Sequence, residues 1–178
     1  SKVPTIRVNY RKTFAADNQE FNSDLFTMTL DQSISAGNFG NFRYNLRGGI
    51  FVEQKDIPFM DLLQAKGNQL LVVTASQFNS FNLLEYYRFF TNDKYAEGHI
   101  EHNFKGSLLG RIPLLNKLNF HLIAGAKALV MADNRPYTEF SVGLGNLGLG
   151  KWRFLRVDYV RSYYANQKND GFVLRFNL

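Results

Sequence analysis

The feature that most constrains the fold of this chain is a two-residue alternation of apolar and polar side chains along most of its length. Between Thr5 and Phe14, for example, Ile6, Val8 and Tyr10 alternate with arginine and asparagine. Successive side chains of a β-strand point to opposite faces, whereas the apolar residues of a helix recur every three or four positions. The pattern therefore predicts an all-β chain.

Eight segments carry the alternation and are predicted as strands of a single domain covering residues 1–178. Their approximate ranges are 5–14, 24–35, 41–53, 95–104, 118–130, 139–145, 154–164 and 171–178. Residues 54–93 are less regular, and a hairpin within them would raise the count to ten. Forty residues without structure are unusual in a compact domain, so this segment is predicted to be a long extracellular or inward-folded loop.

The strands fit an antiparallel up-and-down transmembrane β-barrel, either complete or the C-terminal half of a larger barrel. The mean hydropathy is only −0.25, but lipid-facing and interior residues alternate along a barrel strand and their hydropathies cancel. Aromatic residues make up 15% of the chain, and they suit both strands and membrane interfaces. The alternation alone leaves open a soluble β-sandwich or lipocalin-like binding protein, because it does not say which face meets water.

Charge and cysteine content exclude several function classes. The net charge is +6, yet the basic residues are scattered singly, so the chain is not expected to bind nucleic acid. A cationic lumen or contact with anionic lipid accounts for the charge. The absence of cysteine excludes disulfides and thiolate chemistry.

No pattern predicts catalysis, a metal or a cofactor. The sequence holds no Gly-x-Ser-x-Gly motif, and on a strand His99 and Glu101 share a face while His102 points away, which is too few ligands for a closed zinc site. Residues 143–148 fit Gly-x-Gly-x-x-Gly, but no helix follows them. The chain is therefore not expected to be an enzyme.

Charged residues on the polar faces of the strands are predicted to face the lumen. In a narrow barrel such residues more often pair with one another than select a substrate. The predicted set is Arg43, Arg47, Glu101, Arg156 and Asp158.

The last strand resembles the C-terminal insertion signal that outer-membrane barrels present to their assembly machinery. Its alternating apolar residues are Phe172, Leu174, Phe176 and Leu178. The resemblance implies that the barrel-assembly machinery is a partner.

The order of motifs resembles the BamA-type assembly-factor superfamily, also called the bacterial surface-antigen family. From Glu101 onward the motifs are Glu-x-x-Phe (101–104), Pro-Leu-Leu-x-Lys-Leu (113–118), Val-Gly-Leu-Gly (142–145) and Leu-Arg-Val-Asp-Tyr (155–159). The chain is more similar still to an outer-membrane family of unknown function that carries an N-terminal carboxypeptidase-regulatory-like domain. The shared motifs are Pro58-Phe59, Leu62-Leu63, Gly67-Asn68, Phe-Asn-Leu-x-x-Tyr-Tyr (81–87), Asp-Lys-Tyr-Ala (93–96) and Arg-Ile-Pro-Leu-Leu (111–115).

The resemblance places a loop tip at Lys66, Gly67 and Asn68 and predicts that it folds back toward the lumen. In the superfamily an Arg-Gly pair at this tip contacts an acidic residue of a wall strand. Here the pair reads Lys66-Gly67, and the expected strand, 123–127, holds no carboxylate. The residues of this chain therefore do not predict the contact between tip and wall strand, nor the assembly activity that this contact supports in the superfamily.

The resemblance implies a non-enzymatic protein of the bacterial outer membrane with a scaffold, protein-assembly or translocation role. Its expected partners are outer-membrane lipid, the assembly machinery and other outer-membrane proteins. A passive pore or small-solute-binding barrel is the first alternative, and the soluble binding protein is the second. Leu178 is expected to face the periplasm, which puts residues 54–93 on the outer side.

Overall fold

A computed structural model describes residues 3–14, 22–54, 62–68, 70–74, 77–113, 115–149 and 152–176. These residues form β-strands and four short 3-10 turns, with no α-helix among them, so the all-β prediction is confirmed. The same residues contain no helix that is long and apolar enough to span a membrane.

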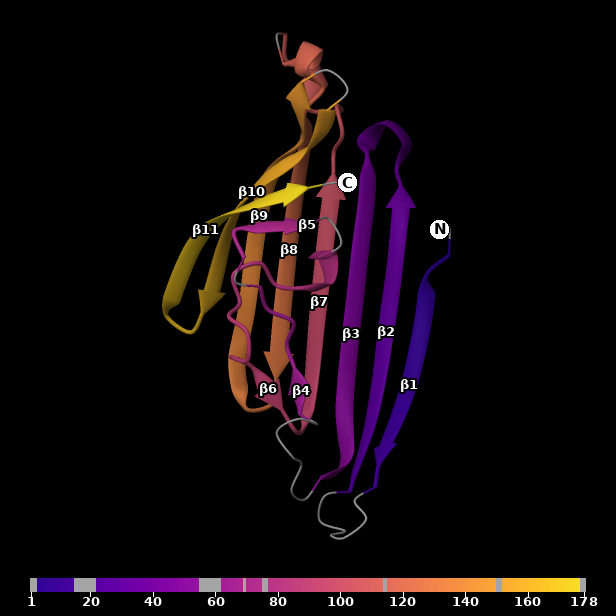
Figure 1. Cartoon of the computed structure of the whole chain (residues 1–178). Coiled ribbons are helices and arrows are strands. Elements are labelled where there is room, and N and C mark those ends of the chain that lie inside the picture. Colours follow the sequence, from indigo (N-terminus) through magenta and orange to yellow (C-terminus); the bar gives the residue numbers. More distant parts are fainter. Residues whose placement is uncertain are drawn as a thin grey trace.

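Eight long strands follow one another in chain order and pair antiparallel with their neighbours (Figure 1). We refer to them together as the wall. The predicted up-and-down order of eight strands is confirmed. The strands are β1 (Thr5–Thr13), β2 (Ser23–Ser35), β3 (Asn41–Gln54), β7 (Lys94–Asn103), β8 (His121–Met131), β9 (Asn134–Leu149), β10 (Trp152–Tyr164) and β11 (Gln167–Phe176).

Three short strands lie between β3 and β7, and they do not form the additional wall hairpin that would have raised the strand count to ten. β4 (Leu63–Gln64) pairs with β6 (Phe90–Thr91) in a separate two-stranded sheet. β5 (Val72–Thr74) instead joins the main sheet in parallel, next to β11. A parallel partner at this edge is not visible in the sequence, because it depends on a contact across about 100 residues.

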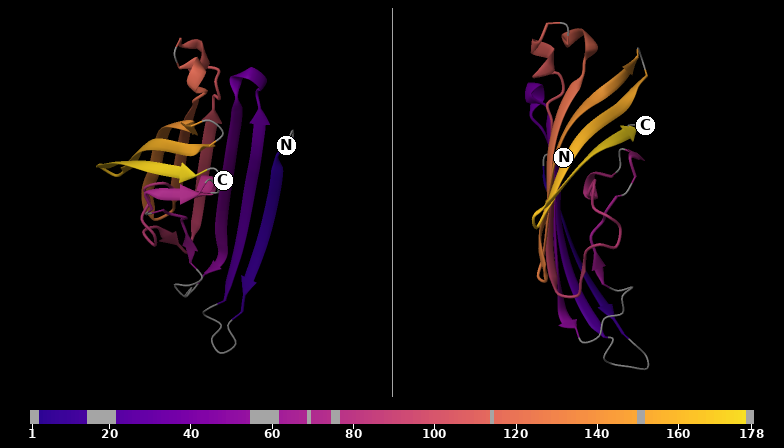
Figure 2. Two further views of the ribbon diagram at one scale, coloured as in Figure 1. Left: turned by 45° about the horizontal axis from the view of Figure 1, so that its top comes forward. Right: turned by 90° about the vertical axis from the view of Figure 1, so that its left-hand side faces the viewer.

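The main sheet of the described residues is curved but open. It runs in the order β1-β2-β3-β7-β8-β9-β10-β11-β5, so β1 forms one edge and β5 the other. The described strands therefore form a large sheet, mostly antiparallel, and not a closed barrel. Figure 2 shows the sheet edge-on, with residues of the β3–β7 connection on its concave side.

The β8–β9 and β10–β11 hairpins are tighter than the sequence predicts. The β8–β9 turn is Ala132–Asp133 and the β10–β11 turn is Ala165–Asn166, whereas the predicted strand ranges leave residues 131–138 and 165–170 between the strands. The strands continue because polar residues pair across them, as Arg161 does with Asp170. Where both faces of a strand are polar, the apolar alternation that marks a strand disappears.

The two faces of the sheet differ in burial. The inner face is the concave one and carries buried polar side chains, among them His99, Glu139 and Asp158, each at most 1% exposed. The outer face carries Phe140 and Val142, both 55% exposed. A soluble sheet protein buries its apolar face and exposes its charges, so this sheet has the reverse arrangement.

The part of the inner face formed by β7 to β11 is covered by the inner segment, which we define as the described residues of the range 62–93. Phe81, Leu84 and Phe89 of this segment are almost fully buried against Leu129, Met131 and Tyr137 of β8 and β9. A second cluster joins Val73 of β5 to Val160 and Val173. The apolar core of the described chain thus lies between the inner segment and the sheet.

Candidate functional site

One buried carboxylate fastens the inner segment to β9. Glu139 accepts hydrogen bonds from the backbone N–H of Asn82 at 2.8 Å and of Leu83 at 2.8 Å, and from the hydroxyl of Tyr137 at 2.8 Å. A carboxylate offers two oxygens and can satisfy three donors at once. Glu139 therefore satisfies two backbone amides of a loop that forms no regular ladder there.

The side chain of Asn82 joins the same attachment to two further strands. Its Oδ1 accepts from Lys127 Nζ of β8 at 3.2 Å and from the guanidinium of Arg175 of β11. Lys127 also donates to the backbone oxygen of Ser80 at 2.5 Å. Residues 80–83 are thus held by side chains of three wall strands.

An ion-pair network continues from Arg175 across the inner face. Asp158, whose side chain is fully buried, accepts from Arg175 Nε at 2.7 Å and from Arg156 Nε at 2.8 Å. Arg156 also donates to Glu101 Oε2 at 2.7 Å. Gly143 makes this possible, because a Cβ there would overlap the Asp158 carboxylate. Buried charges of this kind need every partner, since an unpaired charge in the interior is strongly unfavourable.

The five charged residues that the sequence placed in the lumen all lie on the inner face of the sheet. Arg156, Asp158 and Glu101 meet in the network. Arg47 instead pairs with Glu97 at 3.0 Å, and the Arg43 guanidinium stacks 4.2 Å from the centre of the Phe78 ring.

Four residues of the attachment were not predicted. Lys127, Glu139 and Arg175 stand at polar positions of the alternation, which could have identified their face but not their partners. Asn82 lies within an aromatic run, and nothing local marks it.

The predicted loop tip packs against residues 81–85 of the inner segment. Phe81 N–H donates to Lys66 O and Asn68 N–H donates to Leu84 O, both at 2.8 Å. A Cβ on Gly67 would overlap the backbone oxygens of Leu84 and Glu85, so this position requires glycine. Glu139 of β9 is a wall carboxylate that accepts hydrogen bonds from the inner segment, and it holds residues 82 and 83 rather than the Lys66-Gly67 tip. Glu97 of β7 interacts electrostatically with Lys66 but is paired with Arg47.

The histidines considered for a metal site are separated. His99 is fully buried and packs on the Phe81 ring at a centroid distance of 4.9 Å. His102 lies on the opposite face, with Nε2 2.9 Å from Phe39 O. Within the described ranges, no three His, Cys, Asp or Glu residues are grouped in a way that could hold a metal ion.

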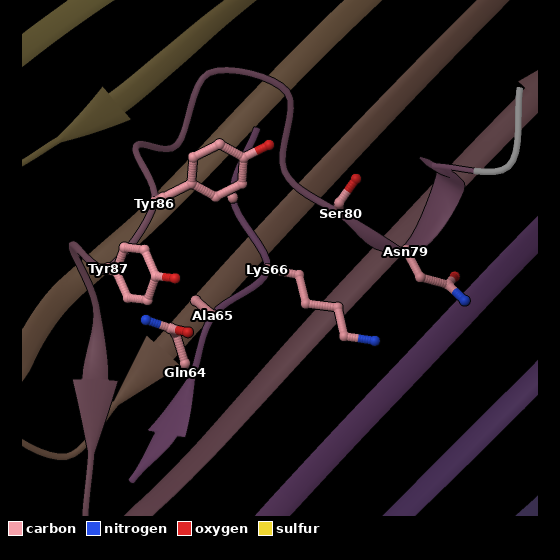
Figure 3. Close-up of a pocket in the computed structure, with 8 residues that line it drawn as sticks. Gln64, Ala65, Lys66, Asn79, Ser80, Tyr86 and Tyr87 are labelled. Carbon is pink, nitrogen blue, oxygen red and sulfur yellow. The ribbon is translucent and has the colours of Figure 1, made fainter. Parts of the chain in front are cut away.

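A pocket of about 520 Å³ opens between residues 64–67 and residues 79–87, which we call the two limbs of the inner segment (Figure 3). Its lining combines aromatic, amide, hydroxyl and ammonium groups. The lining residues are Gln64, Ala65, Lys66, Gly67, Asn79, Ser80, Tyr86 and Tyr87.

The residues compared with an insertion signal lie on the outer face of β11. Phe172 is 62% exposed and packs beside Tyr159 at 5.5 Å between ring centres. Leu174 and Phe176 are half-buried, and Phe176 stacks on Phe154. Leu178 lies outside the described residues.

A comparison with protein families finds one that matches residues 1–144, described as the C-terminal domain of a family of unknown function (DUF5686). The match covers the wall from β1 into β9. Neither the curated proteins nor the solved structures yield a match. The predicted resemblance to a family of unknown function is thereby confirmed, while the outer-membrane location of that family and the resemblance to assembly factors stay predictions.

Proposed function

The chain belongs to the DUF5686 family, whose function is unknown, and we propose that it forms part of the wall of an integral β-barrel in the bacterial outer membrane. In this proposal outer-membrane lipid covers the outer face, and the inner segment fills the space on the inner face. The protein acts as a scaffold or in protein assembly or translocation, without chemistry of its own.

The single observation that carries the membrane proposal is that the sheet exposes its apolar face and buries its charged one. Apolar side chains on seven of the wall strands are exposed on the outer face, while the charges that β7 to β11 carry on the inner face are mostly buried. The exposed outer residues include Ile6, Val8, Phe26, Met28, Leu46, Ile50, Ile100, Val130, Phe140, Val142 and Phe172. Exposed apolar surface of this extent is unfavourable in water and favourable in lipid.

The lengths of the wall strands support the same proposal. They range from 9 residues in β1 to 16 in β9, and a tilted strand needs about 9–11 residues to cross the hydrocarbon core. Phe39, in the turn between β2 and β3, and Trp152, at the start of β10, are strongly exposed, and the antiparallel strand order puts both at the same end of the wall. Aromatic residues gather at membrane interfaces.

The open edge at β1 indicates that other strands complete the barrel. Every residue from Thr5 to Lys12 is exposed, and one side of β1 has no strand partner among the described residues. Unpaired backbone groups do not occur within the hydrocarbon region. We therefore propose that the chain is the C-terminal half of a larger wall, with the missing strands supplied by the same polypeptide or by another outer-membrane protein.

A passive pore is the weaker alternative because the inner segment fills the inner face. Residues 80–83 are fixed there by Glu139, Lys127 and Arg175. A soluble binding protein is weaker still, because it would leave the apolar outer face in water. The assembly machinery remains the expected partner of the C-terminal strand.

Fractionation of the native host tests the membrane proposal. The full-length protein is expected in the outer-membrane fraction, to resist extraction by carbonate and urea, and to run faster on SDS gels before heating than after. A protein that is released by carbonate and stays monodisperse without detergent would contradict the proposal. Planar-bilayer recordings then distinguish a scaffold from a passive pore. No steady conductance is expected, because the inner segment fills the interior.

A further inference from the structure

We propose that the pocket between residues 64–67 and 79–87 is a binding site for an anionic saccharide, a sugar unit that carries a carboxylate or a phosphate. The inference does not depend on a membrane around the sheet. It rests on the hydrogen-bonding groups, the aromatic surface and the charge that the pocket presents.

The lining of the pocket is rich in polar side chains. Among the described residues, the buried Oδ1 of Asn79 has no hydrogen-bond partner, and the lining side chains of Gln64, Tyr86 and Tyr87 are exposed and open to a ligand. The neighbouring network around Glu139 and Asp158 is, by contrast, densely paired. Convergent polar groups in a concavity are typical of a site for a polar ligand.

Two exposed tyrosines supply an aromatic surface on one side of the pocket. Tyr86 is 45% and Tyr87 66% exposed, and Figure 3 shows both rings extending toward the side of Lys66. A sugar ring has an apolar C–H face and a rim of hydroxyls, which match the apolar face and polar tip of tyrosine. Tyr87 has a φ of 61°, an uncommon conformation for a bulky residue and one that recurs at ligand sites.

The charge of the pocket selects an anion. Lys66 is the sole charged residue of the lining and forms no ion pair within the described part of the chain. Glu97 of β7, a carboxylate with which Lys66 interacts electrostatically, is paired with Arg47 at 3.0 Å. Amides, hydroxyls and one ammonium together suit a sugar that bears one negative group.

The pocket is preorganised by the attachment described above. Ala65 N–H donates to Phe89 O at 3.0 Å and Phe81 N–H donates to Lys66 O at 2.8 Å, which fixes the two limbs to each other. Lys127 of β8 donates a hydrogen bond to the backbone oxygen of Ser80, which fixes that limb to the wall. The volume of about 520 Å³ lies within the range of about 300–1,000 Å³ that is usual for ligand pockets.

Calorimetry on the full-length protein in detergent tests the proposal with three probes. These are trigalacturonate, neutral galactotriose, and the phosphorylated core oligosaccharide released from lipopolysaccharide. At least one acidic probe is expected to bind, and galactotriose is expected to bind at least roughly tenfold more weakly than that probe. No binding of either acidic saccharide, or equal binding of galactotriose, would overturn the proposal.

Variants locate the binding in the pocket. Tyr87→Ala and Lys66→Met should each weaken binding of the acidic probe by roughly tenfold. Tyr10→Ala and Lys12→Met, both on β1 at the opposite edge of the sheet from β11, should leave its affinity unchanged. Tyr87→Phe keeps the ring and should retain most of the affinity, which separates stacking from misfolding. Unchanged binding in both pocket variants would refute the site. Intact lipopolysaccharide in vesicles, compared with the free core, then shows whether the source is a lipid headgroup or a free glycan.

Discussion

Glu139 shows how one side chain can position a loop that has little regular structure. Its carboxylate is buried against β9 and accepts from two consecutive backbone amides of the inner segment and from Tyr137. Around it, Lys127 and Arg175 hold the side chain of Asn82. At the scale of single residues, the attachment of the inner segment therefore depends on a few buried groups with long-range partners.

Glu139→Gln is expected to loosen the inner segment without unfolding the wall. The amide retains one acceptor oxygen but replaces the other with a donor that faces N–H groups. Opening of residues 80–83 should become easier by about 1.5–3 kcal/mol, the usual contribution of hydrogen bonds to a charged group. Hydrogen exchange of a peptide covering 78–85 measures this. Glu85→Gln, at an exposed ion pair with Arg88, is the matched control, and equal exchange in both variants would refute the role of Glu139.

Asp158→Asn is expected to destabilise the folded wall strongly. Asp158 neutralises both Arg156 and Arg175 in the interior, and removing one partner of a buried ion pair costs about 3–5 kcal/mol. The urea midpoint of unfolding in detergent reports the loss. Asp170→Asn, in the half-exposed pair with Arg161, should lower the midpoint far less, because solvent screens that pair. A similar shift in both variants would show that the network does not stabilise the fold.

At the scale of elements, the inner segment behaves as a short insert that is folded back on itself. Its two limbs are joined by the β4–β6 pair and by the close approach of Gly67 to residues 84 and 85. β5 then continues to the edge of β11. The segment therefore contacts the sheet both at its centre and at one edge.

Gly67→Ala is expected to separate the two limbs. The added Cβ would overlap backbone oxygens of Leu84 and Glu85, which cannot move aside as a flexible side chain can. Limited proteolysis should then cleave within 62–93 faster than in the unaltered protein. Gly110→Ala is the control, because a Cβ there meets nothing within 4 Å. Equal cleavage of the two variants would contradict the close packing at Gly67.

The wall strands could be predicted from the sequence because each has an apolar outer face. The range 24–35 is observed as Ser23–Ser35 and 41–53 as Asn41–Gln54. The ends of β9 and β11 were missed because both of their faces are polar there. The partners of Asn82 were missed for another reason: Arg175 lies 93 residues away, and local patterns do not specify contacts at such separations.

At the scale of the whole molecule, the sheet is apolar outside and charged inside. The inner charges are paired with one another and with the inner segment, whereas the outer apolar residues have no protein cover among the described residues. Among the described strands, β1 has a neighbour on one side only. Lipid would cover the apolar outer face, and further strands would pair with the edge of β1. A soluble protein in water would leave the apolar face uncovered and the edge of β1 without a strand partner.

Spin labels on β9 and β11 test the central claim, that lipid covers the outer face. The chain contains no cysteine. With any cysteine elsewhere in the full-length protein replaced by serine, Phe140→Cys, Val142→Cys and Lys168→Cys each accept one label in the protein reconstituted in vesicles. Labels at 140 and 142, on the outer face of β9, should collide often with oxygen and rarely with a water-soluble nickel chelate. The label at 168, near the β10–β11 turn, should show the reverse. Free collision of the nickel chelate at 140 and 142, equal to that at 168, would contradict the account.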